Sequence, residues 1–197
     1  MQSDPTSAVW GGRWEERAGR VLRGRGARAC LVLFLLVLAL LVRGWDIHYR
    51  SLVMDEARQA MYGTLGPFDP RIVTLAATQP QPPLDYYLEA AGMRIFGRTE
   101  FGLRAHAVLL GSFAALFFFL YLWSYHSLRS AALGYLLFLF NPWLLRYSVE
   151  GRPPTCGVFA AVLFLWAFHA LIKYSSLPRA VLLAGAVFLS LVSIGFQ

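Results

Sequence analysis

Blocks of almost uninterrupted apolar residues constrain this chain more than any other feature of its sequence. The clearest block, residues 105–123, reads AHAVLLGSFAALFFFLYLW and contains no Asp, Glu, Lys or Arg. An α-helix of about 20 apolar residues has the length needed to cross the hydrocarbon core of a bilayer. Charged residues make up only 15% of the chain, whereas a soluble domain has about 25%. We therefore predict an all-α polytopic membrane protein.

The apolar blocks divide the chain into a tail, about five membrane spans and one large loop. Residues 1–28 form a polar, Arg-rich tail, and residues 29–197 are expected to form the membrane domain. Loop 46–104, with its own interfacial helices, separates the first two spans. Pro142 is expected to kink or end the third span, because proline removes a backbone donor. The expected spans are residues 29–45, 105–123, 131–148, 155–172 and 180–197.

The first apolar block, residues 29–42, has the length of a signal-sequence core as well as that of a short span. No small-residue cleavage pattern follows it. Arg43 can instead lengthen the span by snorkelling to the lipid headgroups, while Trp45 sits at the interface. We therefore expect an uncleaved anchor helix.

The distribution of charge predicts which face of the membrane each loop occupies. The tail, the turn 125–130 and the loop 173–179 together hold nine of the 18 Lys and Arg residues but three of the 11 Asp and Glu residues. Cytoplasmic loops of membrane proteins carry an excess of Lys and Arg. We therefore predict a multi-pass protein of the cell (plasma or inner) membrane with a cytoplasmic N-terminus. Loop 46–104 and the turn 146–154 are then extracytoplasmic.

Residue patterns argue against two kinds of binding site. The Arg residues flank apolar blocks and form no basic stripe interleaved with aromatic residues, so no nucleic-acid partner is expected. The histidines share no helical turn and match no familiar metal-ligand spacing, so each is expected to be an ordinary core or interfacial residue. They are His48, His106, His126 and His169.

Two adjacent carboxylates, Asp55 and Glu56, open a short helix predicted over residues 55–65. Neighbouring side chains on a helix point about 100° apart, so the two are not expected to act as a pair. A carboxylate near the membrane interface is partly desolvated, which makes it a better general base. The same charges would also stabilise a helix N-terminus through its dipole. The pattern leaves both roles open.

A second helix is predicted in the loop, because Leu84, Leu88 and Ile95 recur at helical spacing. Asp85 and Glu89 fall on another side of this helix. Such an amphipathic helix is expected to lie along the membrane interface rather than to cross the bilayer.

Three polar residues near the expected extracytoplasmic face are candidates for ligand binding. Arg152 carries a planar, permanently charged guanidinium that suits a phosphate, although an Arg at the end of a span also serves as a snorkelling residue. Glu150 could orient Arg152 or simply pair with it. Gln81 stands between prolines that fix φ. Its amide could hydrogen-bond a sugar or a phosphate, or it could belong to a rigid loop without a catalytic role.

Three blocks of the sequence resemble a known family. They are Met54-Asp55-Glu56, residues 81–87 (QPPLDYY) followed by residues 96–104 (FGRTEFGLR), and residues 147–153 (YSVEGRP). Their order and membrane context are similar to those of the membrane-embedded GT-C glycosyltransferases. The similarity is to protein O-mannosyltransferases and to the bacterial enzymes that move aminoarabinose onto lipid A. It covers the N-terminal part of such enzymes.

The resemblance implies transfer of a sugar from a polyprenyl-phosphate donor to an acceptor hydroxyl on the extracytoplasmic face. Asp55 would be the general base that takes the proton of the attacking hydroxyl. Arg152 would neutralise the departing lipid phosphate. Glu56 would either bind a divalent metal ion as a cofactor or hold an Arg in place. The implied partners are membrane lipid, the lipid-linked sugar donor and a protein or glycolipid acceptor.

The chain also departs from this family, which keeps other functions open. Family enzymes are much longer, so a partner that supplies the missing spans is one expectation. A catalytically incomplete scaffold or remnant of the family is the alternative. Gly151 and Pro154 stand where the family usually has a small helix-forming residue and an aromatic residue. A transporter is disfavoured, because it would need ionisable residues at mid-span.

Overall fold

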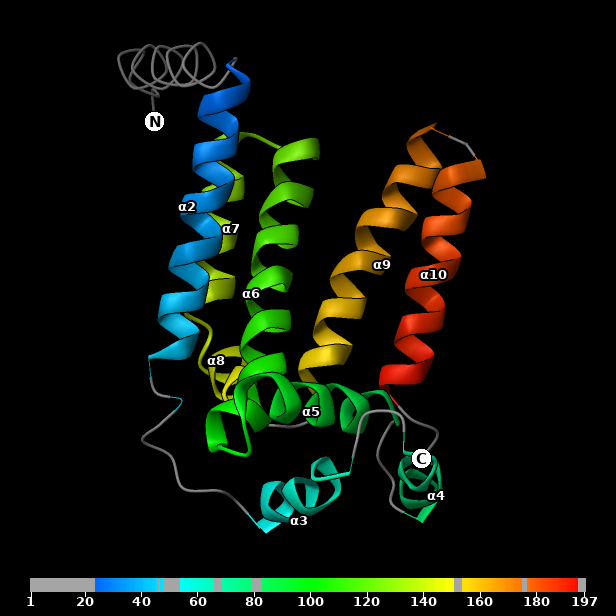
Figure 1. Cartoon of the computed structure of the whole chain (residues 1–197). Helices are drawn as coiled ribbons and strands as arrows, with labels where there is room; N and C mark the ends of the chain where they lie inside the picture. The colour runs from blue at the N-terminus through cyan, green and yellow to red at the C-terminus, as the bar shows by residue number, and fades with distance from the viewer. Residues whose placement is uncertain are drawn as a thin grey trace, which may run out of the picture.

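The structure of the protein is a computed structural model, and every regular element that it describes is an α-helix. It describes residues 24–45, 47, 54–65, 69–78, 83–150, 154–174 and 177–194. Long helices stand upright beside one another, and shorter ones gather at one end of them (Figure 1). The upright helices are α2 (Arg25–Gly44), α6 (Glu100–Tyr125), α7 (Leu128–Leu139), α9 (Pro154–Tyr174) and α10 (Leu177–Ile194). The helices at the end are α3 (Met54–Gly63), α4 (Arg71–Thr78), α5 (Pro83–Phe96) and α8 (Pro142–Ser148).

Within the described residues, three helices are long and apolar enough to cross a membrane. They comprise Arg25–Gly44, Glu100–Tyr125 and Pro154–Lys173. α7 and α8 make a fourth span if they are taken together, with a bend of 60° between them. α10 contributes a shorter apolar stretch, Ala180–Leu189. The predicted all-α polytopic membrane architecture is confirmed, with three to four spans by length and composition where the apolar blocks suggested about five.

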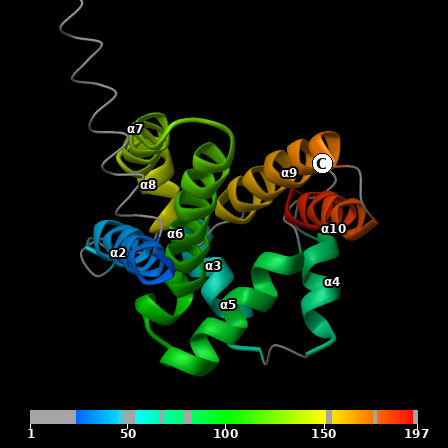
Figure 2. The same ribbon diagram turned by 90° about the horizontal axis from the view of Figure 1, so that it is seen from above.

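α6 is the central helix of the bundle. It contacts α2 and α7 on one side and α9 on the other, and α10 packs against α9 (Figure 2). The core shared by α2, α6 and α7 contains Ala39, Ala115 and Ala131, none of which is exposed. Such small residues let membrane helices approach closely. The hydroxyl of Tyr135 donates a hydrogen bond to the carbonyl oxygen of Leu35 at 2.6 Å, which ties α7 to α2.

The third expected span is broken near its end by the segment around Pro142. α7 ends at Leu139 and α8 begins at Pro142, where proline is well suited because the first turn of a helix needs no backbone donor. The side-chain oxygen of Asn141 caps α8 by accepting from the backbone N–H groups of Trp143 and Leu144 at 3.0 and 3.2 Å. The helix therefore breaks at Pro142, and the chain continues in α8 after a bend of 60°.

α5 lies across the ends of the upright helices and joins α6 through a short turn (Figure 1). Gly97 in this turn has a φ of 86°, a conformation that residues with side chains rarely adopt. Thr99 caps α6 by accepting from the N–H of Gly102 at 3.1 Å. Gly92 of α5 and Gly102 of α6 meet so closely that a Cβ on Gly92 would overlap the carbonyl of Gly102. This contact holds the polar side of α5 against α6.

Replacing Gly92 with Ala should lower the thermal midpoint of unfolding in detergent, because the added methyl group overlaps the backbone of α6 at a cost of about 1–3 kcal/mol. Gly185→Ala in α10 is the matched control, because nothing lies within 4 Å of a Cβ at that position. Since Ala is the better helix former, this control should keep or raise the midpoint. Equal midpoints for the two variants would contradict the close contact between α5 and α6.

Candidate functional site

The structure describes only some of the residues predicted for the site. Asp55 is the second residue of α3, at the same end of the bundle as α5 (Figure 1), but its side chain lies outside the described residues. Gln81 and Arg152 also lie outside the described residues. Glu56 and Glu150 are described, and both are buried.

Glu56 forms a buried ion pair with Arg104 of α6. The guanidinium donates from Nε to Oε1 at 3.1 Å and from Nη2 to Oε2 at 3.0 Å. Its Nη1 donates to the carbonyl oxygen of Ile47 at 2.8 Å. The side chains of Arg104 and Glu56 are 1% and 0% exposed. Glu56 thus holds an Arg, which is one of the two roles that the sequence left open for it, and this pair fastens α3 to α6.

Glu150 pairs with an Arg of its own helix end. Its Oε1 accepts from Nε of Arg146 at 2.8 Å, and the Arg146 side chain is largely exposed. The hydroxyl of Thr155 donates to the carbonyl oxygen of Tyr147 at 2.7 Å, so the start of α9 is tied to the end of α8. The YSVEGRP block therefore begins at the end of α8, where that helix is tied to the start of α9.

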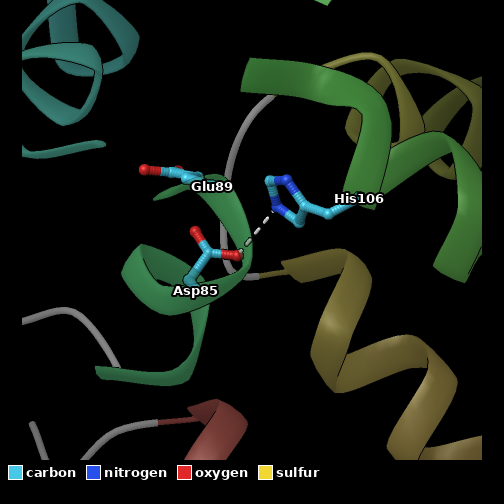
Figure 3. Close-up of side chains that lie close together, drawn as sticks. All are labelled: Asp85, Glu89 and His106. Atoms are coloured by element: carbon cyan, nitrogen blue, oxygen red, sulfur yellow. Dashed lines mark hydrogen bonds and ion pairs between the residues drawn. The ribbon is translucent and has the colours of Figure 1, made fainter. Parts of the chain in front are cut away.

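A buried group of ionisable side chains lies between α5 and α6 (Figure 3). Nε2 of His106 is 3.1 Å from Oδ1 of Asp85, and Nδ1 of His106 is 2.9 Å from the carbonyl oxygen of Leu103. Glu89 adds a second carboxylate, and the ligand atoms of Asp85, Glu89 and His106 all lie within 4.8 Å of one another. Cys156, at the start of α9, donates from Sγ to Oδ1 of Asp85 at 3.6 Å. We call these four side chains the polar cluster.

The polar cluster places negative charges together away from water. Burial raises the pKa of Glu89 well above its ordinary value, and the neighbouring carboxylates of Asp85 and Glu56 raise it further. A buried carboxylate costs free energy unless it is protonated or meets a cation. The cluster is therefore suited to take up a proton or a metal ion.

Arg43, in the last turn of α2, is also buried. Its Nη1 donates to the carbonyl oxygen of Leu144 at 3.0 Å and to Oγ of Ser148, which ties α2 to α8. The side chain is 1% exposed, so the prediction that Arg43 snorkels to the headgroups is wrong. The carbonyl and the hydroxyl of α8 both accept from Nη1, whereas Nε and Nη2 are buried without a hydrogen-bond partner among the described residues. Trp45, expected beside it at the interface, is 83% exposed.

A hollow of about 260 Å³ opens between the end of α3 and α5. Two exposed guanidinium groups, those of Arg94 and Arg98, belong to its lining. The full lining comprises Gly63, Thr64, Leu65, Ala90, Met93, Arg94 and Arg98.

The sequence contains signals of the polar cluster, but they become visible only when residues are considered in pairs. Asp85 and Glu89 are four residues apart, which places them on one face of a helix. Arg104 and His106 open an apolar block, where ionisable residues need buried partners. Which faces meet depends on the tight turn between α5 and α6, and no local pattern reports that geometry. His106 is consequently a core residue, but not an ordinary one.

Comparison with protein families identifies the chain. Residues 80–193 match the family model described as dolichyl-phosphate-mannose-protein mannosyltransferase, and this range is more than half of the 197 residues. The chain belongs to the dolichyl-phosphate-mannose-protein mannosyltransferase family. It is therefore a multi-pass membrane protein of a GT-C type glycosyltransferase family, and the resemblance seen in the sequence is confirmed. No match to the chain occurs among curated proteins or among solved structures.

The range that matches the mannosyltransferase family contains some of the site residues and excludes others. It includes Gln81, the polar cluster and the YSVEGRP block with Arg152. It begins after Asp55 and Glu56. The role of Asp55 therefore stays a prediction from its residue type and its place in the chain.

Replacing Arg104 with Gln should leave Glu56 buried without its counter-charge, and the loss of one partner of a buried ion pair costs about 3–5 kcal/mol. The expected result is a clear drop in the thermal midpoint of unfolding in detergent. Arg71→Gln is the control, because the Arg71 side chain is 70% exposed in its pair with Asp69 and exposed pairs contribute little.

The double variant Glu56→Gln/Arg104→Gln should recover part of the lost stability, because no unpaired buried charge is left. A double variant no more stable than Arg104→Gln alone would show that the two side chains are not coupled.

Proposed function

We propose that this protein transfers a sugar from a polyprenyl-phosphate donor to a hydroxyl group of a protein or a glycolipid. The family match over residues 80–193 is the observation that carries the proposal, because the family is described by mannosyl transfer from dolichyl phosphate to protein. The helical arrangement is compatible with this reaction. The short helices α3, α4, α5 and α8 gather at one end of the upright helices, where the headgroup of a membrane-anchored donor would be met (Figure 1).

The proposed reaction takes place on the extracytoplasmic face of the cell membrane. The support is the excess of Lys and Arg in the tail 1–28, the turn 125–130 and the loop 173–179. The two basic segments that connect helices lie at the end of the bundle opposite to α5 (Figure 1). With that end in the cytoplasm, α3 and α5 are extracytoplasmic.

In the proposed chemistry, the acceptor oxygen attacks the anomeric carbon while the bond between that carbon and the phosphate oxygen breaks. Asp55 accepts the proton of the acceptor hydroxyl, and the electron pair of the broken bond leaves with the polyprenyl phosphate. Attack from the side opposite to the phosphate inverts the anomeric carbon. The ion pair of Glu56 with Arg104 supports the assignment of Asp55, because it immobilises the helix that carries the proposed base.

The phosphate of the donor needs positive charge at this end of the bundle. Arg152 stays the proposed ligand for the leaving phosphate, with Glu150 and Gln81 as further substrate-binding residues. Arg94 and Arg98 offer two more guanidinium groups beside a hollow large enough for a sugar ring. Guanidinium groups form strong charge-assisted hydrogen bonds with phosphate oxygens.

Asp55→Asn should reduce sugar transfer by about 10²-fold or more, because the amide cannot accept the proton that a general base removes. The measurement is the transfer of radiolabelled mannose from a polyprenyl phosphate in membranes that contain the variant, with insertion checked by membrane fractionation. Asp69→Asn, in the same loop, is the matched control and should keep wild-type transfer.

Wild-type rates in Asp55→Asn would remove Asp55 from the role of base. Absence of transfer by the wild-type protein with polyprenyl-phosphate sugars would favour the catalytically incomplete scaffold instead.

Arg94→Gln/Arg98→Gln should raise the donor KM severalfold, and the effect should shrink at high ionic strength, since salt screens exposed charges. Arg129→Gln, in the first turn of α7 at the other end of the bundle, should leave the donor KM unchanged. Initial rates at varied donor concentration measure both. An unchanged donor KM in the double variant would show that the two Arg residues of the hollow do not bind the donor.

A further inference from the structure

We propose that Asp85, Glu89 and His106 bind a divalent transition-metal ion of the zinc class, which links α5 to α6. Each residue offers one ligand atom, and these atoms lie within 4.8 Å of one another. The two carboxylates come from successive turns of α5 and the imidazole from the neighbouring helix (Figure 3). This proposal stands on the geometry of the polar cluster and does not depend on sugar transfer.

Each ring nitrogen of His106 faces an oxygen atom that can accept a hydrogen bond. Nδ1 lies 2.9 Å from the carbonyl oxygen of Leu103, which can only accept, so Nδ1 carries a proton. In a neutral ring Nε2 then holds a lone pair, and it lies 3.1 Å from Oδ1 of Asp85. Two acceptors at this distance require a cation between them, either a proton or a metal ion. A metal-bound histidine commonly donates its other N–H to a backbone carbonyl, as His106 does.

The separation of the His106 and Asp85 ligand atoms suits a small ion, which would draw together a set of atoms that lie within 4.8 Å of one another. Ligand atoms held about 2.0–2.2 Å from a tetrahedral zinc ion are roughly 3.3–3.6 Å from one another. The separation of 3.1 Å between Nε2 of His106 and Oδ1 of Asp85 is close to that spacing. Oδ2 of Asp85 is buried and has no hydrogen-bond partner among the described residues. A buried carboxylate oxygen without a donor has a lone pair available for a cation.

The charge of the buried carboxylates also favours a cation at this position. Asp85 and Glu89 are 1% and 0% exposed, so two carboxylates lie together away from water. A divalent ion held by both carboxylates would neutralise their charges together.

The types of donor select the class of metal. Imidazole suits zinc and its neighbours in the transition series, whereas Mg²⁺ and Ca²⁺ prefer oxygen ligands alone. The thiol of Cys156 lies 3.6 Å from Oδ1 of Asp85 and provides a soft donor next to the three proposed ligands. A set of two carboxylates, an imidazole and a nearby thiol therefore favours zinc.

The test is the zinc content of the full chain purified in detergent, dialysed against metal-free buffer and then titrated with zinc chloride. We expect one tightly held zinc ion per chain, and a rise in the thermal midpoint that a chelator reverses. His106→Gln and Asp85→Asn should weaken zinc binding by more than about tenfold, since even changes around a metal ligand cost 10- to 100-fold. His126→Gln, an exposed histidine just beyond the end of α6, is the matched control and should bind zinc as the wild type does.

X-ray absorption at the zinc edge on the wild-type protein gives a readout that needs no variant. One imidazole with oxygen neighbours is the expected ligand set, even if the substitutions prevent folding. A helical wild-type chain that neither retains zinc nor gains thermal stability from it would overturn the proposal and leave a proton shared between His106 and Asp85. Equal zinc affinity in His106→Gln and His126→Gln would overturn it as well.

Discussion

The ion pair between Arg104 and Glu56 is the interaction on which this end of the molecule depends. Arg104 lies in the second turn of a helix that continues through an apolar block, and its guanidinium has no access to water. A buried charge of this kind is tolerated only with a close counter-charge and with its other donors satisfied. Glu56 supplies the counter-charge, and the carbonyl oxygen of Ile47 accepts a hydrogen bond from another nitrogen of the guanidinium. One side chain thereby joins α6, α3 and the segment that follows α2.

Most of the buried ionisable groups described here occupy the same end of the upright helices. Arg43 stands in the last turn of α2, Arg104 and His106 in the first turns of α6, and Cys156 in the first turn of α9. At mid-span such groups would cost far more, because neither water nor headgroups could reach them. Their shared level is compatible with the proposed reaction of a lipid-linked donor at the membrane surface.

Local sequence patterns predicted the elements better than their contacts. The helix expected over residues 55–65 corresponds to α3, and the amphipathic pattern from Leu84 to Ile95 corresponds to α5. The break at Pro142 followed from the chemistry of one residue. These features depend on spacing and backbone preference, which neighbouring residues reveal. α6 begins at Glu100 rather than at residue 105, because Thr99 provides a cap that an apolar window does not register.

The candidate site was harder to predict, because its residues find partners across the fold. Glu56 and Arg104 are 48 residues apart in the chain, and Arg43 and Ser148 are 105 apart. Snorkelling was the natural expectation for Arg43, since its neighbours in sequence are apolar on one side and interfacial on the other. Only the packing of α8 against α2 and α6 reveals the carbonyl and hydroxyl that it meets. The polar cluster likewise exists because α5 crosses α6.

The glycine contact between α5 and α6 has a mechanical consequence. A helix that spans a bilayer adjusts its tilt to the thickness of the hydrocarbon layer. Because the turn between the two helices is short and their backbones touch at Gly92 and Gly102, α5 must swing as a lever when α6 tilts. Lipid chain length then sets the inclination of α5 to the membrane surface, while the glycine contact keeps the spacing of Asp85 and His106 constant.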